Sequence, residues 1–175
     1  MSFVIVPAGP SDAAELARVH VAAWRETYGG LLPAAFLARM SEVMHARRFG
    51  RMLLAAGPEM VTLVAADRNG LVGYAEGGPS RSKAPGEAEI ATLYVLKAAQ
   101  GHGLGRRLLV DTARALSAQG ATSLMISVLR DNAPARAFYE HLGGVADPSR
   151  PERGPGGALL HEVAYRWADI RTVTG

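Results

Sequence analysis

The stretch "YVLKAAQGHGLGRRLL", from Tyr94 to Leu109, decides the fold class because it joins a strand-like run to a helix-like run through a loop of alternating glycines. The glycines are Gly101, Gly103 and Gly105. A helix N-terminus exposes unpaired backbone N–H groups and a partial positive charge, and glycines let a ligand approach the main chain closely. The stretch therefore predicts an anion-binding loop between a strand and a helix.

The spacing of this loop excludes the two common nucleotide-binding motifs. A P-loop carries Lys and then Ser or Thr after its last glycine, but Gly105 is followed by Arg106 and Arg107. A dinucleotide fingerprint has glycine at its first, third and sixth positions, and the sixth position counted from Gly101 is Arg106. The loop is therefore expected to bind a different phosphate-containing ligand.

The segments around the loop alternate between strands and helices. Apolar residues at helical spacing predict a helix over Gly103–Gln119, which Gly120 ends. Apolar runs predict strands over Ala88–Leu96 and Thr122–Leu129, and a short helix is expected over Ala133–Leu142. A strand, loop, helix, strand and helix therefore follow one another in the second half of the chain.

The first half predicts two helices that precede most of the sheet. Ser11 or Asp12 can cap the first helix, and Glu15 lies at capping-box spacing from Asp12. Pro33 opens a second helical pattern that continues to Leu54. The other expected segments are a first strand (Phe3–Gly9), two strands (Glu59–Ala66 and Leu71–Gly78) with a hairpin turn at Asn69–Gly70, two loops (Pro79–Glu87 and Asp147–Gly157) and a late strand (Ala158–Trp167).

The composition indicates a single domain of a cytoplasmic protein. The 175 residues are 49% hydrophobic, which is enough for one substantial core, so we expect one domain over residues 1–175. No run of about 18 apolar residues predicts a membrane span, and the N-terminus lacks the pattern of a signal peptide. The absence of cysteine excludes disulfides and thiolate chemistry.

The basic excess is small and dispersed. The net charge is +3, and no Lys or Arg block is longer than two residues, so a nucleic-acid partner is not expected. Neither H-E-x-x-H nor G-x-S-x-G occurs, so we expect neither a metal site nor a serine hydrolase. An anion preference in one pocket is the better explanation of the charge.

The glycine loop resembles the signature of the GNAT superfamily, the acyl-coenzyme-A-dependent N-acyltransferases. Gln100, Gly103 and Gly105 fill the three defining places of Q/R-x-x-G-x-G/A, and "LYV" precedes the glutamine in the strand before it. The order of the expected elements is also similar to that of the family. The resemblance implies an α/β (α+β) fold with a mixed, mostly antiparallel sheet of six to seven strands flanked by about four helices.

A second segment carries the same resemblance. Asn132, Ala135 and Tyr139 match the family's N-x-x-A-x-x-x-Y pattern, and their i, i+3, i+7 spacing places them on one helical face. The resemblance implies that the donor is acetyl-coenzyme A, with its pyrophosphate on the backbone N–H groups of the loop and its pantetheine arm along the preceding strand. The implied coenzyme-binding residues are Tyr94, Val95, Gln100, Gly101, His102, Gly103, Leu104, Gly105, Arg106, Asn132, Ala135 and Tyr139.

The resemblance also suggests the catalytic groups. Tyr139 is the candidate proton donor to the departing thiolate, although it could instead only pack its ring. A backbone N–H near Val95 would stabilise the oxyanion. Glu89 is the candidate base, and strand alternation places it on the same side as Val95 unless a bulge intervenes. A strand-end carboxylate or a substrate anchor is the alternative for Glu89, and Glu76 and Glu87 are weaker candidates.

The amine that receives the acetyl group is left open by the sequence. We expect its pocket to involve Trp24–Pro33, Tyr74, Glu76 and the loop Asp147–Gly157, although aromatic residues such as Trp24 and Tyr28 are more often plain core residues. The substrate would be the primary amine of a small molecule or a peptide. The alternatives are a non-catalytic acyl-coenzyme-A-binding module, and a different acyl group, such as succinyl, met by Arg81 or Arg153. Since many family members dimerise, a homodimer is compatible with the resemblance.

Overall fold

A single twisted sheet runs through the computed structural model, which describes residues 2–148, 150–154 and 159–174. Within these residues the sheet has eight strands, and β4 and β5 form the parallel pair while the other pairs are antiparallel. This confirms the mixed, mostly antiparallel sheet. The strands in sheet order are β1 (Val4–Pro7), β2 (Val61–Asp67), β3 (Gly70–Pro79), β4 (Glu87–Val95), β5 (Ser123–Leu129), β8 (Leu159–Trp167) and β6 (Val145–Ala146), with β7 (Arg150–Arg153) also pairing β8.

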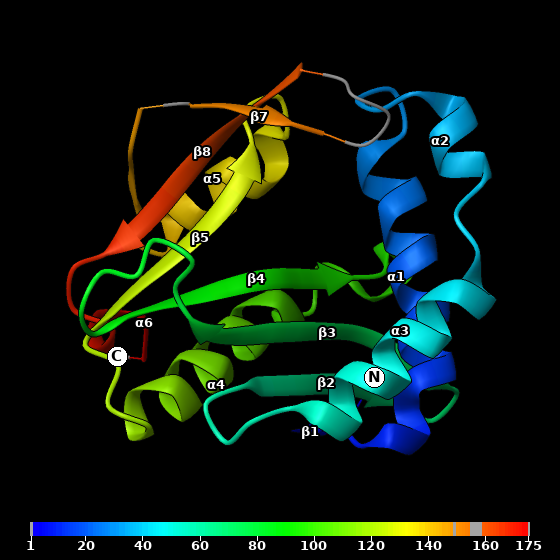
Figure 1. Ribbon diagram of the computed structural model, residues 1–175, viewed down its shortest axis with the longest axis horizontal. Coiled ribbons are helices and arrows are strands. Elements are labelled where there is room, and N and C mark those ends of the chain that lie inside the picture. The colour runs from blue at the N-terminus through cyan, green and yellow to red at the C-terminus, as the bar shows by residue number, and fades with distance from the viewer. Residues whose placement is uncertain (1, 149, 155–158, 175) are drawn as a thin grey trace.

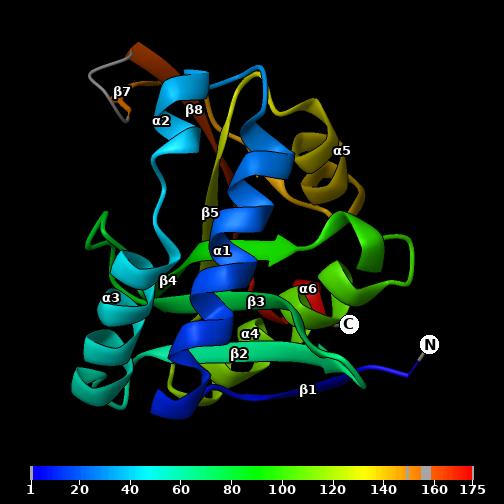
Figure 2. The same cartoon turned by 90° about the vertical axis from the view of Figure 1, so that its right-hand side faces the viewer.

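Helices cover both faces of this sheet (Figures 1 and 2). Helices α1 and α3 pack on one face, where they form a buried cluster with β2 and β3. Helix α4 packs on the other face against β2, β3 and β4. The helices are α1 (Ala13–Tyr28), α2 (Ala34–Ala38), α3 (Glu42–Ala55), α4 (Leu104–Ala118), α5 (Ala133–His141) and α6 (Arg171–Thr174), of which α2 and α6 are the shortest.

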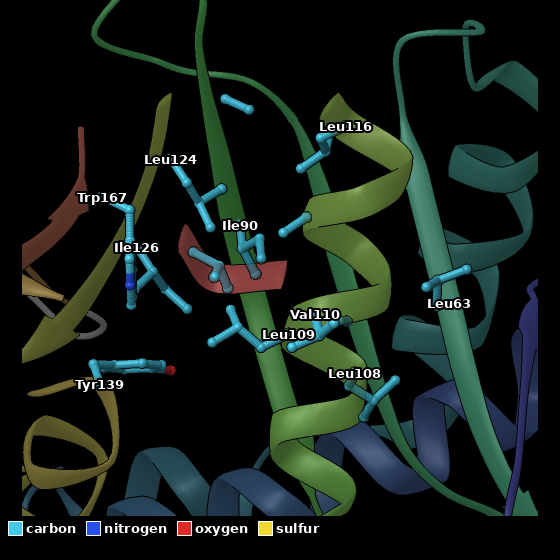
Figure 3. Close-up of a cluster of buried hydrophobic side chains, with 14 of the residues drawn as sticks. Leu63, Ile90, Leu108, Leu109, Val110, Leu116, Leu124, Ile126, Tyr139 and Trp167 are labelled. Carbon is cyan, nitrogen blue, oxygen red and sulfur yellow. The ribbon is translucent and has the colours of Figure 1, made fainter. Parts of the chain in front are cut away.

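The larger core lies between α4, α5 and the sheet (Figure 3). Leu108 and Leu109 of α4 are fully buried, and Ile90 of β4 packs with them. Tyr139 enters the same cluster from α5, and in Figure 3 its hydroxyl points away from α5 toward the side of α4 and β4. The apolar helix face expected from the sequence is therefore the face that anchors α4 behind the glycine loop.

Two helix boundaries differ from the sequence-based expectation. The helical pattern from Pro33 breaks into α2 and α3 at Ser41, whose Oγ accepts a hydrogen bond from Met44 N. The expected capping box at Asp12 is wrong, because the Asp12 carboxylate accepts from Gly9 N and the Glu15 carboxylate accepts from Leu71 N. Glu15 thus ties α1 to the start of β3 instead of closing its own first turn.

A bulge interrupts β4 and reverses its side-chain alternation. Ile90 pairs with Gly77 and Thr92 pairs with Glu76, so Ala91 is an extra residue in β4. Ile90 lies before this residue and belongs to the core on the α4 face.

The reversal changes the expected position of Glu89. Leu93 and Val95, which follow the bulge, pack against the same core cluster as Ile90. Because Glu89 and Ile90 are adjacent in the strand, their side chains point to opposite faces. Glu89 is therefore on the α1 face, and the expectation that it shares a side with Val95 is wrong.

Candidate active site

The site is a cavity of about 1110 Å³ at the point where β4 and β5 separate. The two strands pair in parallel over three residues, from Glu87–Ser123 to Glu89–Met125, and then diverge. Figure 1 shows β4 and β5 starting side by side and spreading apart, and Figure 2 shows α1 crossing the sheet beside this gap. The separated strands leave edge backbone groups of β4 and β5 facing a common space.

The glycine loop forms one end of this cavity. Gly101 and Gly103 have φ values of 79° and 71°, in the left-handed region that favours glycine. A Cβ atom built on either residue would meet no heavy atom within 4 Å, so the main chain is bare on this side. Helix α4 begins at Leu104 with Gly103 as its N-cap, and both line the cavity. A bare loop at a helix N-terminus fits a phosphate group.

The third glycine has a packing role. A Cβ at Gly105 would lie 3.4 Å from Cζ of Phe138, an ordinary van der Waals distance, so the first turn of α4 packs next to α5 at this point. Both residues line the cavity. The loop therefore combines two bare positions with one close contact between helices.

The polar side chains of the loop organise the loop itself. Gln100 Nε2 donates a hydrogen bond to Val95 O at 2.9 Å, which ties the loop to the end of β4. His102 Nδ1 lies 2.9 Å from Gln100 O, and its exposed ring packs edge-on against Phe3. Arg106 lines the cavity and adds positive charge beside the loop.

Helix α5 supplies the second wall of this end. Asn132 is its N-cap, and Asn132 Oδ1 accepts from Ala135 N at 3.3 Å. Asn132, Ala135 and Tyr139 all line the cavity, as their shared helical face predicts. We call the glycine loop (Gln100–Arg106) and these three residues the α4 side of the cavity.

Tyr139 is buried where the cavity passes between the strands. Burial raises the pKa of its hydroxyl well above the usual value, and the nearby Tyr28 adds to the shift. No hydrogen bond of the Tyr139 hydroxyl is formed within the described part of the chain. A phenol that keeps its proton and faces a cavity can donate that proton.

Aromatic and charged side chains form the opposite end. Trp24 and Tyr28 come from the last turns of α1, Tyr94 comes from β4 and Glu162 comes from β8. We call Trp24, Tyr28, Tyr94 and Glu162 the α1 side of the cavity. The Tyr28 and Tyr94 hydroxyl oxygens lie 2.9 Å apart, and burial raises the pKa of both phenols. The alternative that Trp24 and Tyr28 are plain core residues is wrong.

Glu89 lies beside this end without lining it. Its side chain is only 3% exposed, and Arg81 Nε and Nη2 donate to its carboxylate while Arg81 N donates to Oε2. Arg81 itself lines the cavity and its side chain is 74% exposed. Arg81 was one of the two arginines considered as a partner for the carboxylate of a succinyl group. In the structure it is paired with the Glu89 carboxylate.

Tyr74 lies beneath the cavity wall. It is 1% exposed and its hydroxyl is 2.6 Å from His20 Nδ1. Burial is the first cause that lowers the pKa of His20, to about 3, and the charges of His45 and Arg48 lower it further. The expectation that Tyr74 forms part of the pocket surface is wrong.

Two other expected pocket elements are also revised. Glu76 is absent from the described cavity wall, and burial raises its pKa. The expected loop Asp147–Gly157 contains β7, paired with β8, and Gly154 lines the cavity. Positions 149 and 155–158 of that loop lie outside the described residues, and the side chain of Arg153 is not described.

Glu162 is the site residue that the sequence did not single out. It faces the cavity from the strand "LLHEVAYRW", where it interrupts an apolar run in the same way as Glu89 does in its own strand. An acidic residue at a half-buried strand position was the available signal. In the described parts of the chain, no group of three or more metal-ligating side chains is present, and no helix is long and apolar enough to cross a membrane.

A split sheet with a bare glycine loop at one end and a phenol at the crossing point defines an α/β acyl-group transferase fold. The acetyltransferase (GNAT) family matches residues 18–144, which is well over half of the sequence. The chain belongs to this family of acetyl-coenzyme-A-dependent acetyltransferases.

Individual relatives agree with this assignment. An uncharacterized N-acetyltransferase of Bacillus subtilis strain 168, YuaI, is 30% identical over 164 residues, which cover 91% of this chain and 89% of the relative. A probable N-acetyltransferase of Mycobacterium tuberculosis, Rv2775, is 28% identical and covers 91% of this chain and 90% of its own length.

Solved structures show the same fold at lower identity. The PaiA N-acetyltransferase of Thermoplasma acidophilum, solved with coenzyme A, has a TM-score of 0.69 at 19% identity, over 95% of this chain and all of that one. YncA of Salmonella typhimurium, solved with acetyl-coenzyme A, has a TM-score of 0.71 at 23% identity, over 97% of this chain and 95% of that one.

Proposed function

We propose that the protein transfers an acetyl group directly from acetyl-coenzyme A to a primary amine of a small molecule or a peptide. One observation carries the proposal: a single cavity joins the bare glycine loop, the Tyr139 phenol and the acidic, aromatic α1 side. Donor and amine can then approach the same point from opposite ends. The whole chain, residues 1–175, would act as one catalytic domain.

The α4 side holds the donor in this proposal. The first-turn N–H groups of α4 have no acceptor within their own helix, so the main chain from Gly101 to Arg106 offers donors to the pyrophosphate. The separated edge of β4 at Tyr94 and Val95 offers backbone groups to the pantetheine arm. Asn132 and Ala135 would lie along the same arm.

The reaction needs a neutral amine, stabilisation of charge on the acetyl oxygen and a proton for the leaving sulfur. The amine nitrogen attacks the acetyl carbon, and the carbon–sulfur bond breaks as the Tyr139 hydroxyl gives its proton to the sulfur. The nitrogen then loses its extra proton to the Tyr139 oxygen, which leaves the amide, the coenzyme A thiol and a neutral tyrosine. The backbone N–H of Val95 would stabilise the oxygen. Glu89 lies behind the wall of the cavity, so we propose that it takes the ammonium proton through a water molecule.

Two measurements test the donor and the activity separately. Isothermal titration with acetyl-coenzyme A should show binding, and a thiol reagent should detect coenzyme A release with a panel of primary amines. Binding without release on any amine would favour the alternative of a non-catalytic coenzyme-binding module. Absence of binding would contradict both functions.

The role of Glu89 has its own test. Glu89→Gln keeps an oxygen that can accept from Arg81 but cannot take a proton at neutral pH, so it should change the pH dependence of kcat/KM for the amine. Thermal unfolding checks that the variant remains folded. A pH profile identical to that of the wild type would reduce Glu89 to a structural partner of Arg81.

A further inference from the structure

Arg81 and Glu89 form an ion pair whose two partners have different surroundings. The Glu89 side chain is only 3% exposed, whereas the Arg81 side chain is 74% exposed. Arg81 lines the cavity, and Glu89 lies outside the described cavity wall. The pair therefore joins a buried carboxylate to a residue that meets the contents of the cavity.

The guanidinium and the main chain of Arg81 together hold both oxygens of the Glu89 carboxylate. Arg81 Nε lies 2.9 Å from Oε1 and 3.1 Å from Oε2, and Nη2 also donates to Oε1. Arg81 N donates to Oε2 at 3.0 Å. An arginine that binds a carboxylate through two donors fixes its orientation as well as its charge. The Glu89 carboxylate is therefore both oriented and neutralised by one residue of the loop before β4.

The loop that carries Arg81 is held by contacts of its own. Ser80 and Ser82, which flank Arg81, each donate through Oγ to Glu87 Oε1 at 2.7 Å. Ser80 N donates to Glu87 O at 3.0 Å. The other carboxylate oxygen of Glu87 binds Arg166 of β8. A substitution of the Arg81 side chain should therefore leave the loop backbone in place.

The positive charge of Arg81 matters because Glu89 is buried. Burial makes a carboxylate harder to ionise, and a cation within hydrogen-bonding distance makes it easier. The cations that act on Glu89 in the described part of the chain are Arg81 and, from β8, Arg166. Arg166 is bound by the carboxylates of Glu87 and Asp147. Arg81 is therefore the cation in direct contact with the Glu89 carboxylate.

We propose that Arg81 is the positioning residue of the proposed base, and that it keeps the Glu89 carboxylate ionised and oriented to receive a proton. The inference rests on the proposed acetyltransferase function and deepens it by naming the residue that controls the base. One proton passes from the substrate ammonium to a water molecule of the cavity, and that water passes a proton to Glu89. The neutral amine is then free to attack, and Glu89 returns its proton to solvent after each turnover. Arg81 itself exchanges no proton.

Variants that separate charge from hydrogen bonding test this role by coenzyme A release with the full-length protein and one reactive amine. Arg81→Gln keeps a hydrogen-bond donor and removes the charge, so Glu89 should hold its proton to higher pH. The acidic limb of the kcat/KM profile should then move to higher pH by about one pH unit or more, and raising the pH should restore most of the wild-type rate. Arg81→Lys keeps the charge and should move the limb by less than about half that amount. An unmoved limb in Arg81→Gln, with a rate lowered equally at every pH, would indicate a merely structural role and overturn the inference.

Arg171→Gln is the matched control. Arg171 binds the Asp169 carboxylate through the same three groups, its N, Nε and Nη2. That pair is exposed, with side chains 81% and 41% exposed, and it lies outside the described cavity wall. The control should keep the wild-type profile. A limb that moves as far in Arg171→Gln as in Arg81→Gln would overturn the assignment to Arg81.

The Glu89→Gln background separates the two levels of the proposal. Without an ionisable group at position 89, adding Arg81→Gln should leave the profile of Glu89→Gln unchanged, and a further shift would assign the effect to another group and overturn the inference. Titration with acetyl-coenzyme A should give the wild-type Kd in every variant, which also shows that they fold. A protein that acetylates amines with an unmoved limb in Arg81→Gln would retain the proposed function and lose only this inference. Failure to acetylate any amine would overturn both.

Discussion

The two ends of the cavity differ in whether main chain or side chains line them. The α4 side consists largely of main chain, with left-handed glycines and the first turn of α4. The α1 side consists of side chains from α1, β4 and β8, which are far apart in the sequence. Under the proposed function, the donor common to the family would be held by backbone geometry, whereas the amine would be selected by side chains.

Tyr139 lies where the two ends meet, so its removal should have the largest effect. Tyr139→Phe should lower turnover by about 10- to 1000-fold, because the leaving sulfur loses its proton donor. The ring and its core contacts remain, so the Kd of acetyl-coenzyme A should stay the same. Steady-state kinetics and titration check the two halves of this prediction, and unchanged turnover would exclude Tyr139 as the acid.

A methyl group on the glycine loop should affect the donor end alone. Gly103→Ala places a Cβ where the main chain now faces open space, so the Kd of acetyl-coenzyme A should rise by about tenfold. Gly120→Ala is the matched control, since Gly120 also has a positive φ and open space but lies outside the described cavity wall. If both variants change the Kd equally, backbone strain and not ligand contact is the cause.

The α1 side should respond to a smaller change. Tyr28→Phe removes the hydrogen bond to the Tyr94 hydroxyl and should raise KM for the amine by about 3- to 10-fold. The Kd of acetyl-coenzyme A should not change, because the donor contacts other residues. A change confined to the donor would show that the two ends had been assigned the wrong way round.

The smallest expected effect concerns His20, which contacts the Tyr74 hydroxyl beneath the α1 side of the cavity. The pKa of His20 is lowered to about 3 in the folded protein, against 6.5 in the unfolded chain, so between these values the unfolded state binds more protons. The contribution of neutral His20 to the free energy of unfolding is therefore fully present above pH 6.5 and is lost as the pH falls toward 3. We expect a drop in Tm of about 4 °C or more between pH 7 and pH 5.

Variants separate this imidazole from the others. The groups that face His20 are His45, Arg48 and the Tyr74 hydroxyl, and the pKa of His45 is also lowered by burial. His20→Gln should reduce the drop in Tm measured by circular dichroism, whereas His102→Gln, at an exposed loop position, should leave it unchanged. Equal drops in all three proteins would exclude His20 as the source.

The sequence predicted the backbone-built half of the site better than the half built from side chains. Gln100, Gly103 and Gly105 carry their information in a short contiguous motif, and the helical spacing of Asn132, Ala135 and Tyr139 places these residues on the cavity wall as expected. The sheet type and the longer helices follow from local patterns in the same way.

The α1 side could not be predicted because it depends on tertiary arrangement. Nothing local distinguishes Glu162, which reaches the cavity, from Glu89, which lies behind its wall. Tyr28 and Tyr74 are similar residues in sequence, but only Tyr28 lies at the surface of the cavity. The break at Ser41 was hidden because apolar residues at helical spacing continue across it.

The extra residue in β4 also limits how this strand can change in length. With Ala91 in place, Ile90 and Leu93 both reach the core although they are three positions apart. Deleting Ala91 would leave Ile90 and Leu93 two positions apart, so strict alternation would keep both on the core face, whereas a one-residue deletion outside the bulge would turn the side chains beyond it to the wrong face. The exposed Ala91 is therefore a position at which the strand can lose one residue without turning its neighbours, and a deletion scan along β4 would detect this difference, which substitutions at Ala91 would miss.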